Sequence, residues 1–209
     1  MKKLVILFFV ALLVSCSSTK LIDQWHNPDT PVYEAQKILV VGMSPDKQVR
    51  RTYEEALSQQ LERKGIVAVR SVDFFENVFQ VDEKTEKEMD LIENLLLEAG
   101  FDSILFSKVT GSEDKVTLLQ SYNSFKKEFT NFKDYYIENQ HVYASPTSES
   151  YKVYHTETSI FCLCAGKERE LLWKGNIDLV GPEKSKKSID EYIKVLMKSF
   201  EENRIVLPQ

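Results

Sequence analysis

The sequence predicts an α/β domain, in which a β-α-β-α-β parallel unit is followed by a C-terminal antiparallel hairpin and a final helix. Two stretches with a helical apolar stripe each end at a glycine, Gly65 and Gly100, and each is followed by strand-forming residues. Residues 153–162 then alternate as a strand does. Because single helices join the first strands, we expect these to lie parallel in the order 2-1-3, in a mixed sheet of about five strands.

The first β-α-β unit covers residues 36–69. Residues 38–41 are consecutive β-formers without alternation, as expected for a strand covered on both faces. Ser44 and Pro45 suit an N-cap and a first helical position. The helix carries one apolar stripe at three- and four-residue steps, made of Val49, Tyr53, Ala56, Leu57 and Leu61. Residues 66–69 then begin the second strand.

The remaining elements follow the same logic. A helix over residues 84–99 should place Met89, Ile92, Leu95, Leu96 and Ala99 inward. A third strand follows in the sequence FDSILFSKV, and the hairpin combines residues 153–162 with a strand that carries Leu171 and Trp173 on one face. The last helix is expected at about Lys186 to Glu202, and no linker or internal repeat divides the chain.

The regular pattern fails in an aromatic-rich insertion at about 111–150. So long a stretch without evident structure is usually functional or disordered. Its aromatic residues could close over the sheet as a lid or present an interface to another protein, and the two interpretations are evenly balanced. The residues concerned are Tyr122, Phe125, Phe129, Phe132, Tyr135 and Tyr136.

The N-terminus has the layout of a secretory signal peptide. Lys2 and Lys3 precede an apolar run of 11 residues, Leu4 to Val14, which as a helix is about 16 Å long and too short to span a bilayer. The sequence LVSC then resembles the lipobox of bacterial lipoproteins. The resemblance implies cleavage between Ser15 and Cys16, a diacylglycerol thioether on the Cys16 sulfur and often a further acyl chain, such as palmitate, on its amine.

This interpretation divides the chain into a signal peptide (1–15), a lipidated tether (16–24) and one domain (25–209). Removing residues 1–15 removes two of the 27 Lys and Arg residues and none of the 32 Asp and Glu residues, which leaves a net charge of −7. This charge argues against nucleic acid and against a polybasic grip on the membrane. The lipid itself must then hold the protein, and Ser17, which is not the aspartate retention signal, favours the outer membrane, facing the periplasm.

Residues with a potential chemical role are scattered. Nucleotide-binding and hydrolase motifs are missing from the sequence, so we expect no catalytic residue, metal or cofactor. His155, Glu157 and Asp178 could meet at a metal ion, but solvent-facing strand positions explain them better. Arg50 and Arg51 suit an anion site less well than a solvated helix face paired with glutamates.

Cysteines and tryptophans favour packing roles. Cys162 and Cys164 are spaced i, i+2 along a strand, which is poor geometry for a disulfide, and are expected to be small apolar core residues. We expect Trp25 and Trp173 to be buried by packing rather than to form ligand platforms.

Three stretches together resemble a family of uncharacterised bacterial lipoproteins with a small α/β domain. They are Gln24-Trp25, the run ILVVGMSPDKQVRRTYEEALSQQLERKGIVAV, and ETSIF with the later LLWKGNIDLV. The resemblance implies neither an activity nor site residues. Because the sequence contains no recognisable nucleophile-base or ligand constellation, we expect a non-enzymatic binding or scaffold module with an envelope protein partner. The alternative is a small-ligand-binding protein or hydrolase with a pocket between the sheet and the insertion.

Overall fold

The computed structural model describes residues 19–75, 84–113, 131–140, 153–164, 170–180 and 186–207. In chain order the elements are β1 (Thr19–His26), β2 (Tyr33–Glu34), β3 (Lys37–Met43), α2 (Lys47–Arg63), β4 (Val67–Arg70), α3 (Ser71–Phe74), α4 (Glu86–Glu98), β5 (Ser103–Glu113), α6 (Phe132–Asn139), β6 (Val153–Cys162), β7 (Leu171–Val180), α7 (Lys186–Glu202) and β8 (Ile205–Leu207). The predicted α/β class and the predicted bounds of the last helix are confirmed.

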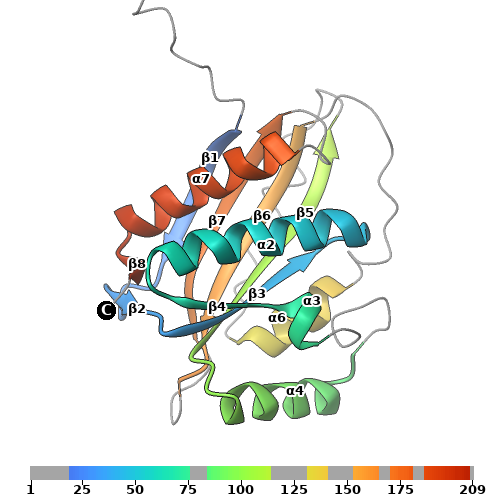
Figure 1. Ribbon diagram of the computed structural model, residues 1–209, viewed down its shortest axis with the longest axis vertical. Coiled ribbons are helices and arrows are strands. Elements are labelled where there is room, and N and C mark those ends of the chain that lie inside the picture. Colours follow the sequence, from blue (N-terminus) through green and yellow to red (C-terminus); the bar gives the residue numbers. More distant parts are fainter. Residues whose placement is uncertain are drawn as a thin grey trace, which may run out of the picture.

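The main sheet has six strands in the order β1-β7-β6-β5-β3-β4 (Figure 1). Strands β4, β3 and β5 are parallel neighbours, which confirms the predicted order 2-1-3. Strands β6 and β7 form the predicted antiparallel hairpin, and β6 pairs with β5. A second, small sheet pairs β2 with β8.

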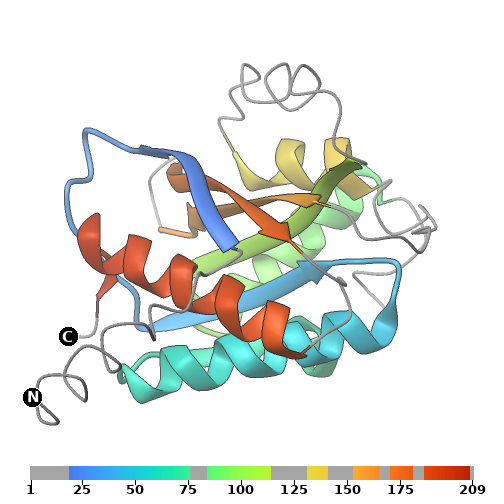
Figure 2. The ribbon, with the colours of Figure 1, turned by 90° about the horizontal axis from the view of Figure 1, so that it is seen from above.

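Helices cover both faces of the sheet, so the domain has three layers (Figure 2). Helices α2 and α7 lie together on one face, where the fully buried Trp173 packs edge-on against Phe200 with ring centroids 5.1 Å apart. Helices α4 and α6 lie on the other face and pack on apolar residues of β3, β5 and β6. Among the described helices, none is both long and apolar enough to cross a membrane.

Strand β1 is the largest departure from the sequence analysis. Residues 19–24 were expected to be tether, whereas the structure places them in an edge strand that runs antiparallel to β7. The main sheet therefore has six strands rather than the expected five or so, and β1 is the additional one. The expected burial of Trp25 is also wrong, because Trp25 lies on this edge strand and is 39% exposed.

Two details of the helices also differ. Helix α2 is capped by Asp46 rather than Ser44, since the Asp46 carboxylate accepts hydrogen bonds from the backbone of Gln48 (2.9 Å) and Val49 (3.2 Å). On α4, Leu96 is buried, but Leu95 was wrongly expected to face inward and is 51% exposed. Neighbouring helical residues project about 100° apart, and on α4 the buried positions Met89, Ile92, Glu93 and Leu96 define a face from which Leu95 points away.

Candidate functional site

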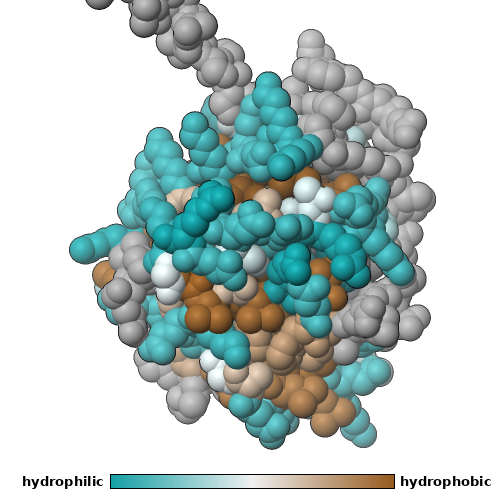
Figure 3. Space-filling view, viewed as in Figure 1, coloured by the Kyte–Doolittle hydropathy of each residue, from teal (hydrophilic) through white to brown (hydrophobic). Residues whose placement is uncertain are grey.

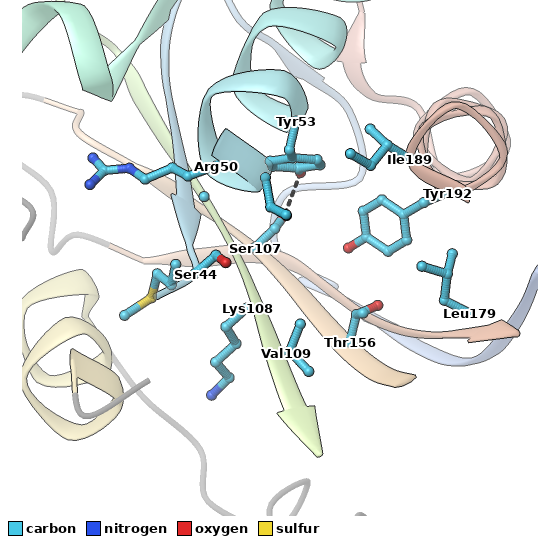
Figure 4. Close-up of a pocket in the computed structure, with 13 residues that line it drawn as sticks. Ser44, Arg50, Tyr53, Ser107, Lys108, Val109, Thr156, Leu179, Ile189 and Tyr192 are labelled. Atoms are coloured by element: carbon cyan, nitrogen blue, oxygen red, sulfur yellow. Dashed lines mark hydrogen bonds between the residues drawn. The ribbon is translucent and has the colours of Figure 1, made fainter. Parts of the chain in front are cut away.

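A cavity of about 80 Å³ lies between the sheet, the start of α2 and the start of α7 (Figure 4). We call it the inner pocket. It lies beyond the carboxyl end of β3, the edge at which open α/β sheets commonly hold ligands. The lining residues are Gly42, Met43, Ser44, Val49, Arg50, Tyr53, Ser107, Lys108, Val109, Thr156, Leu179, Ile189 and Tyr192.

A chain of buried hydroxyls lies at the inner pocket. The Tyr53 hydroxyl bonds to Ser107 Oγ (2.5 Å), which bonds to Thr158 Oγ1 (2.6 Å), and Thr158 bonds in turn to the Tyr192 hydroxyl. Burial is the main cause that raises the pKa of both Tyr53 and Tyr192. The phenols therefore stay protonated and bond to their neighbours, as structural hydroxyls do.

Arg50 lines the inner pocket, but its guanidinium points away from it (Figure 4). Arg50 Nε donates to Glu54 Oε1 (3.0 Å), and both side chains are buried. The Glu54 carboxylate also accepts hydrogen bonds from the backbone of Gly42 (2.9 Å) and Val72 (2.9 Å) and from the Ser71 hydroxyl (2.7 Å). The expected pairing of Arg50 with a glutamate is confirmed, but the solvated setting is wrong. This cluster joins α2 to the end of β3 and the start of α3.

A second buried ionic cluster, which the sequence did not predict, lies on the opposite face of the sheet. Glu157 lies 3.2 Å from Lys108 Nζ and 2.8 Å from Lys174 Nζ, and all three are buried. Burial alone would raise the pKa of Glu157, but the two ammonium groups outweigh it, so the pKa is lowered. Lys108 also lies 4.8 Å from the ring centre of Tyr135. The available signal was that Lys108, Glu157 and Lys174 each stand in the middle of a strand with large apolar residues close by in the sequence.

The structure does not form the metal site that was considered. His155 Nδ1 lies 2.6 Å from Asp178 Oδ1, while Glu157 is held by the lysines. Within the described ranges, no three His, Cys, Asp or Glu side chains gather closely enough to hold a metal ion.

Three of the six aromatic residues expected at an interface or lid are core residues. Phe132, Tyr135 and Tyr136 belong to α6 and are buried. Tyr135 and Tyr136 lie 5.5 and 5.9 Å from Phe106 between ring centres, so α6 covers the sheet. The interface role is wrong for these three, and their place on the sheet agrees with the alternative of a cover. Tyr122, Phe125 and Phe129 lie outside the described residues.

The expectation that Cys162 and Cys164 form no disulfide is wrong. The structure joins Cys162 and Cys164 in a disulfide, with their Cα atoms 5.3 Å apart. Because β6 ends at Cys162, the chain is no longer fully extended here, and the Cα separation falls within the range that a disulfide accepts. Ser15 and Cys16 lie outside the described residues.

A wider depression of about 760 Å³ runs between α2 and α7 on the molecular surface. We call it the outer groove. Figure 3 shows the surface over these helices as mostly hydrophilic, whereas hydrophobic side chains gather lower down, near β4 and α4. The lining residues are Ala56, Gln59, Gln60, Arg63, Lys64, Lys186, Asp190, Ile193, Lys194, Met197, Lys198 and Glu201.

The outer groove is basic on an acidic chain. Five of its lining residues are lysine or arginine, and two are acidic. Lys64 pairs with Glu201, and Lys198 lies 3.5 Å from Glu202. Arg63, Lys186 and Lys194 form no ion pair with any residue that the structure describes. Three of the five positive charges in the groove therefore have no ion-pair partner within the described part of the chain.

The fold and these two depressions define a three-layer α/β domain with two candidate binding sites at the α2–α7 face. No protein-family model matches the chain, and no curated protein sequence matches it. Several solved structures are similar to this chain at low sequence identity. The PelC dodecamer from Paraburkholderia phytofirmans is 10% identical, with 90% of this chain and 98% of that chain covered and a TM-score of 0.43.

Two further solved structures are similar to the same degree. Lipoprotein GNA1162 from Neisseria meningitidis is 15% identical, with 80% of this chain and 99% of that chain covered and a TM-score of 0.41. A DUF4136 family protein from Bacteroides thetaiotaomicron is 12% identical, with 92% and 100% covered and a TM-score of 0.39. At these scores, the similarities assign neither a family nor a function.

Proposed function

We propose that the protein is an envelope lipoprotein that acts as a non-enzymatic binding module, held by lipid on Cys16 at the outer membrane and facing the periplasm. The LVSC sequence supports the anchor. The start of β1 supports a position close to the membrane, because Thr19 follows Cys16 by three residues, which span at most about 11 Å. The tether is thus much shorter than the roughly 30 Å available to residues 16–24 if all were extended.

The observation that carries the proposal is the outer groove. Its positive charge opposes the net charge of −7 that the sequence gives after cleavage. A positive patch on a negatively charged protein attracts acidic partners and orients them. This attraction acts over about 8 Å at physiological salt. The partly exposed apolar side chains of Ala56 and Met197 among the lysines add a surface that a protein segment can cover. We therefore assign the groove to an acidic segment of another envelope protein.

A cellular crosslinking experiment tests this assignment. A photo-crosslinking amino acid replaces Lys194 in the groove, or, as the control, the exposed Lys87 on α4. We expect one discrete adduct from position 194, which disappears when Lys186→Glu and Arg63→Glu are introduced. A Lys87→Glu variant should keep it. Equal adducts from both positions, or an adduct indifferent to the charge reversals, would contradict the assignment.

We also propose that Tyr122, Phe125 and Phe129 of the insertion contact the partner protein. Deleting 111–150 as a whole is a poor test, because it would remove Phe132, Tyr135 and Tyr136 from the core. Replacing Tyr122, Phe125 and Phe129 by serine changes no residue of the described core. If these residues contact the partner, the triple variant should weaken the position-194 adduct without lowering thermal stability. An unchanged adduct would restrict the interface to the outer groove.

A further inference from the structure

The polar side chains that line the inner pocket form hydrogen bonds with other groups of the protein. The Tyr53 and Tyr192 hydroxyls belong to the buried hydroxyl chain. Thr156 Oγ1 donates to the carbonyl of Ile177 (2.6 Å), and Ser44 Oγ accepts a hydrogen bond from the backbone of Asp46 (3.2 Å).

The two charged lining residues are engaged elsewhere. Arg50 pairs with Glu54 (3.0 Å), and Lys108 reaches Glu157 (3.2 Å) on the other face of the sheet. A polar guest entering the pocket would give up its hydration for few hydrogen bonds, which is unfavourable. The remaining wall consists of hydrocarbon from Met43, Val49, Val109, Leu179 and Ile189. The chemistry of the pocket therefore selects an apolar guest.

The inner pocket also lies at the end of the domain where β1 begins. Thr19 stands opposite Leu179 in the strand register, and Leu179 lines the pocket. The Thr19 hydroxyl donates to Glu191 (3.3 Å), the residue before Tyr192 on α7. Figure 1 shows β1 beginning at the end of the sheet at which β5 and β7 end and β6 begins. Three residues of chain, at most about 11 Å long, separate Cys16 from Thr19, which neighbours the pocket wall.

We propose that the inner pocket binds the end of an acyl chain. The cavity of about 80 Å³ has room for roughly six water-sized groups, and therefore for several methylenes rather than a whole chain. The chain comes either from the lipid on Cys16 or from a membrane phospholipid. The first source rests on the proposed anchoring of Cys16, and the second requires only a nearby bilayer.

The test uses photoactivatable acyl chains and the full chain made in cells. Cells are fed a diazirine-labelled palmitate, which labels both phospholipids and any lipid on Cys16. After irradiation, the purified protein is digested and its adducts are mapped by mass spectrometry. We expect adducts on the peptides that carry Val109, Leu179 or Ile189. A phospholipid adduct identifies the membrane as the source, and a link to the Cys16 lipopeptide identifies the protein's own lipid.

Two variants that fill the cavity from different elements make the result specific. Val109→Phe on β5 and Val49→Phe on α2 should each lower the pocket adduct about fivefold or more, because the added ring occupies the space of the acyl chain. Val67→Phe, on the exposed side of β4, is the matched control and should keep the adduct. Thermal melting checks that each variant is folded. If one of the two filling variants does not fold, the other one alone tests the proposal.

Two results would overturn the proposal. One is labelling spread over the surface without enrichment at the pocket peptides. The other is a pocket adduct that persists in both filling variants. The proposed lipid anchor is tested separately: no labelled palmitate on Cys16 of the wild-type protein would contradict it. In that case the phospholipid adduct still tests the pocket.

Discussion

Replacing Glu54 by glutamine tests the buried cluster that ties α2 to the sheet. Glu54 is fully buried, and its carboxylate accepts four hydrogen bonds, from Arg50, Gly42, Ser71 and Val72. The amide removes the negative charge beside a guanidinium that is 6% exposed and turns one acceptor into a donor. Breaking a buried ion pair on one side costs about 3–5 kcal/mol, because the remaining charge is left uncompensated. We expect a loss of this size in the free energy of unfolding.

Urea unfolding at neutral pH, followed by the fluorescence of the buried Trp173, measures this loss. The matched control is Glu55→Gln on the next residue. Its carboxylate is half exposed and lies 3.8 Å from Arg70, so this change should cost less than about 1 kcal/mol. If Glu54→Gln were as mild as Glu55→Gln, the cluster would not stabilise the fold as described.

Three further predictions follow from burial, covalent connectivity and charge. Leu96→Ala should lower the free energy of unfolding by about 2–5 kcal/mol and Leu95→Ala by less than about 1 kcal/mol, since only Leu96 is buried; similar losses in urea unfolding would contradict the orientation of α4. Iodoacetamide should label Cys162 and Cys164 only after reduction, and mass spectrometry showing labelling without reductant would contradict the disulfide. The pKa of Glu157 is lowered in the folded state, so its contribution to stability is present above about pH 4.5 and is lost as pH falls through the folded pKa. Glu157→Gln should therefore have a lower free energy of unfolding than wild type at neutral pH. Between pH 6 and pH 3, urea unfolding should show a smaller loss of this free energy in the variant than in wild type.

The part of the fold that the sequence predicted well depends on local constraints. A helix that joins two strands fixes both their parallel direction and their neighbours, so the order of β4, β3 and β5 followed from the apolar stripes. The hairpin of β6 and β7 and the bounds of α7 also have causes within a few residues.

The missed features depend on distant partners. The sequence of β1 is mostly polar, and its strand structure arises from pairing with β7, more than 140 residues away in the chain. Lys108, Glu157 and Lys174 each look like a surface residue, and their burial depends on the register that places three strands side by side. Similarly, the basic outer groove arises where two helices from opposite ends of the chain meet.

The most direct test of the central claim measures whether the outer groove binds an acidic polymer. The purified chain is titrated with fluorescent poly-L-glutamate, and anisotropy is followed at increasing ionic strength. We predict saturable binding that weakens as salt increases and is lost in the Lys186→Glu, Lys194→Glu double variant, while Lys87→Glu binds as wild type does. Binding that is absent, or that the double variant retains, would contradict the role of the groove.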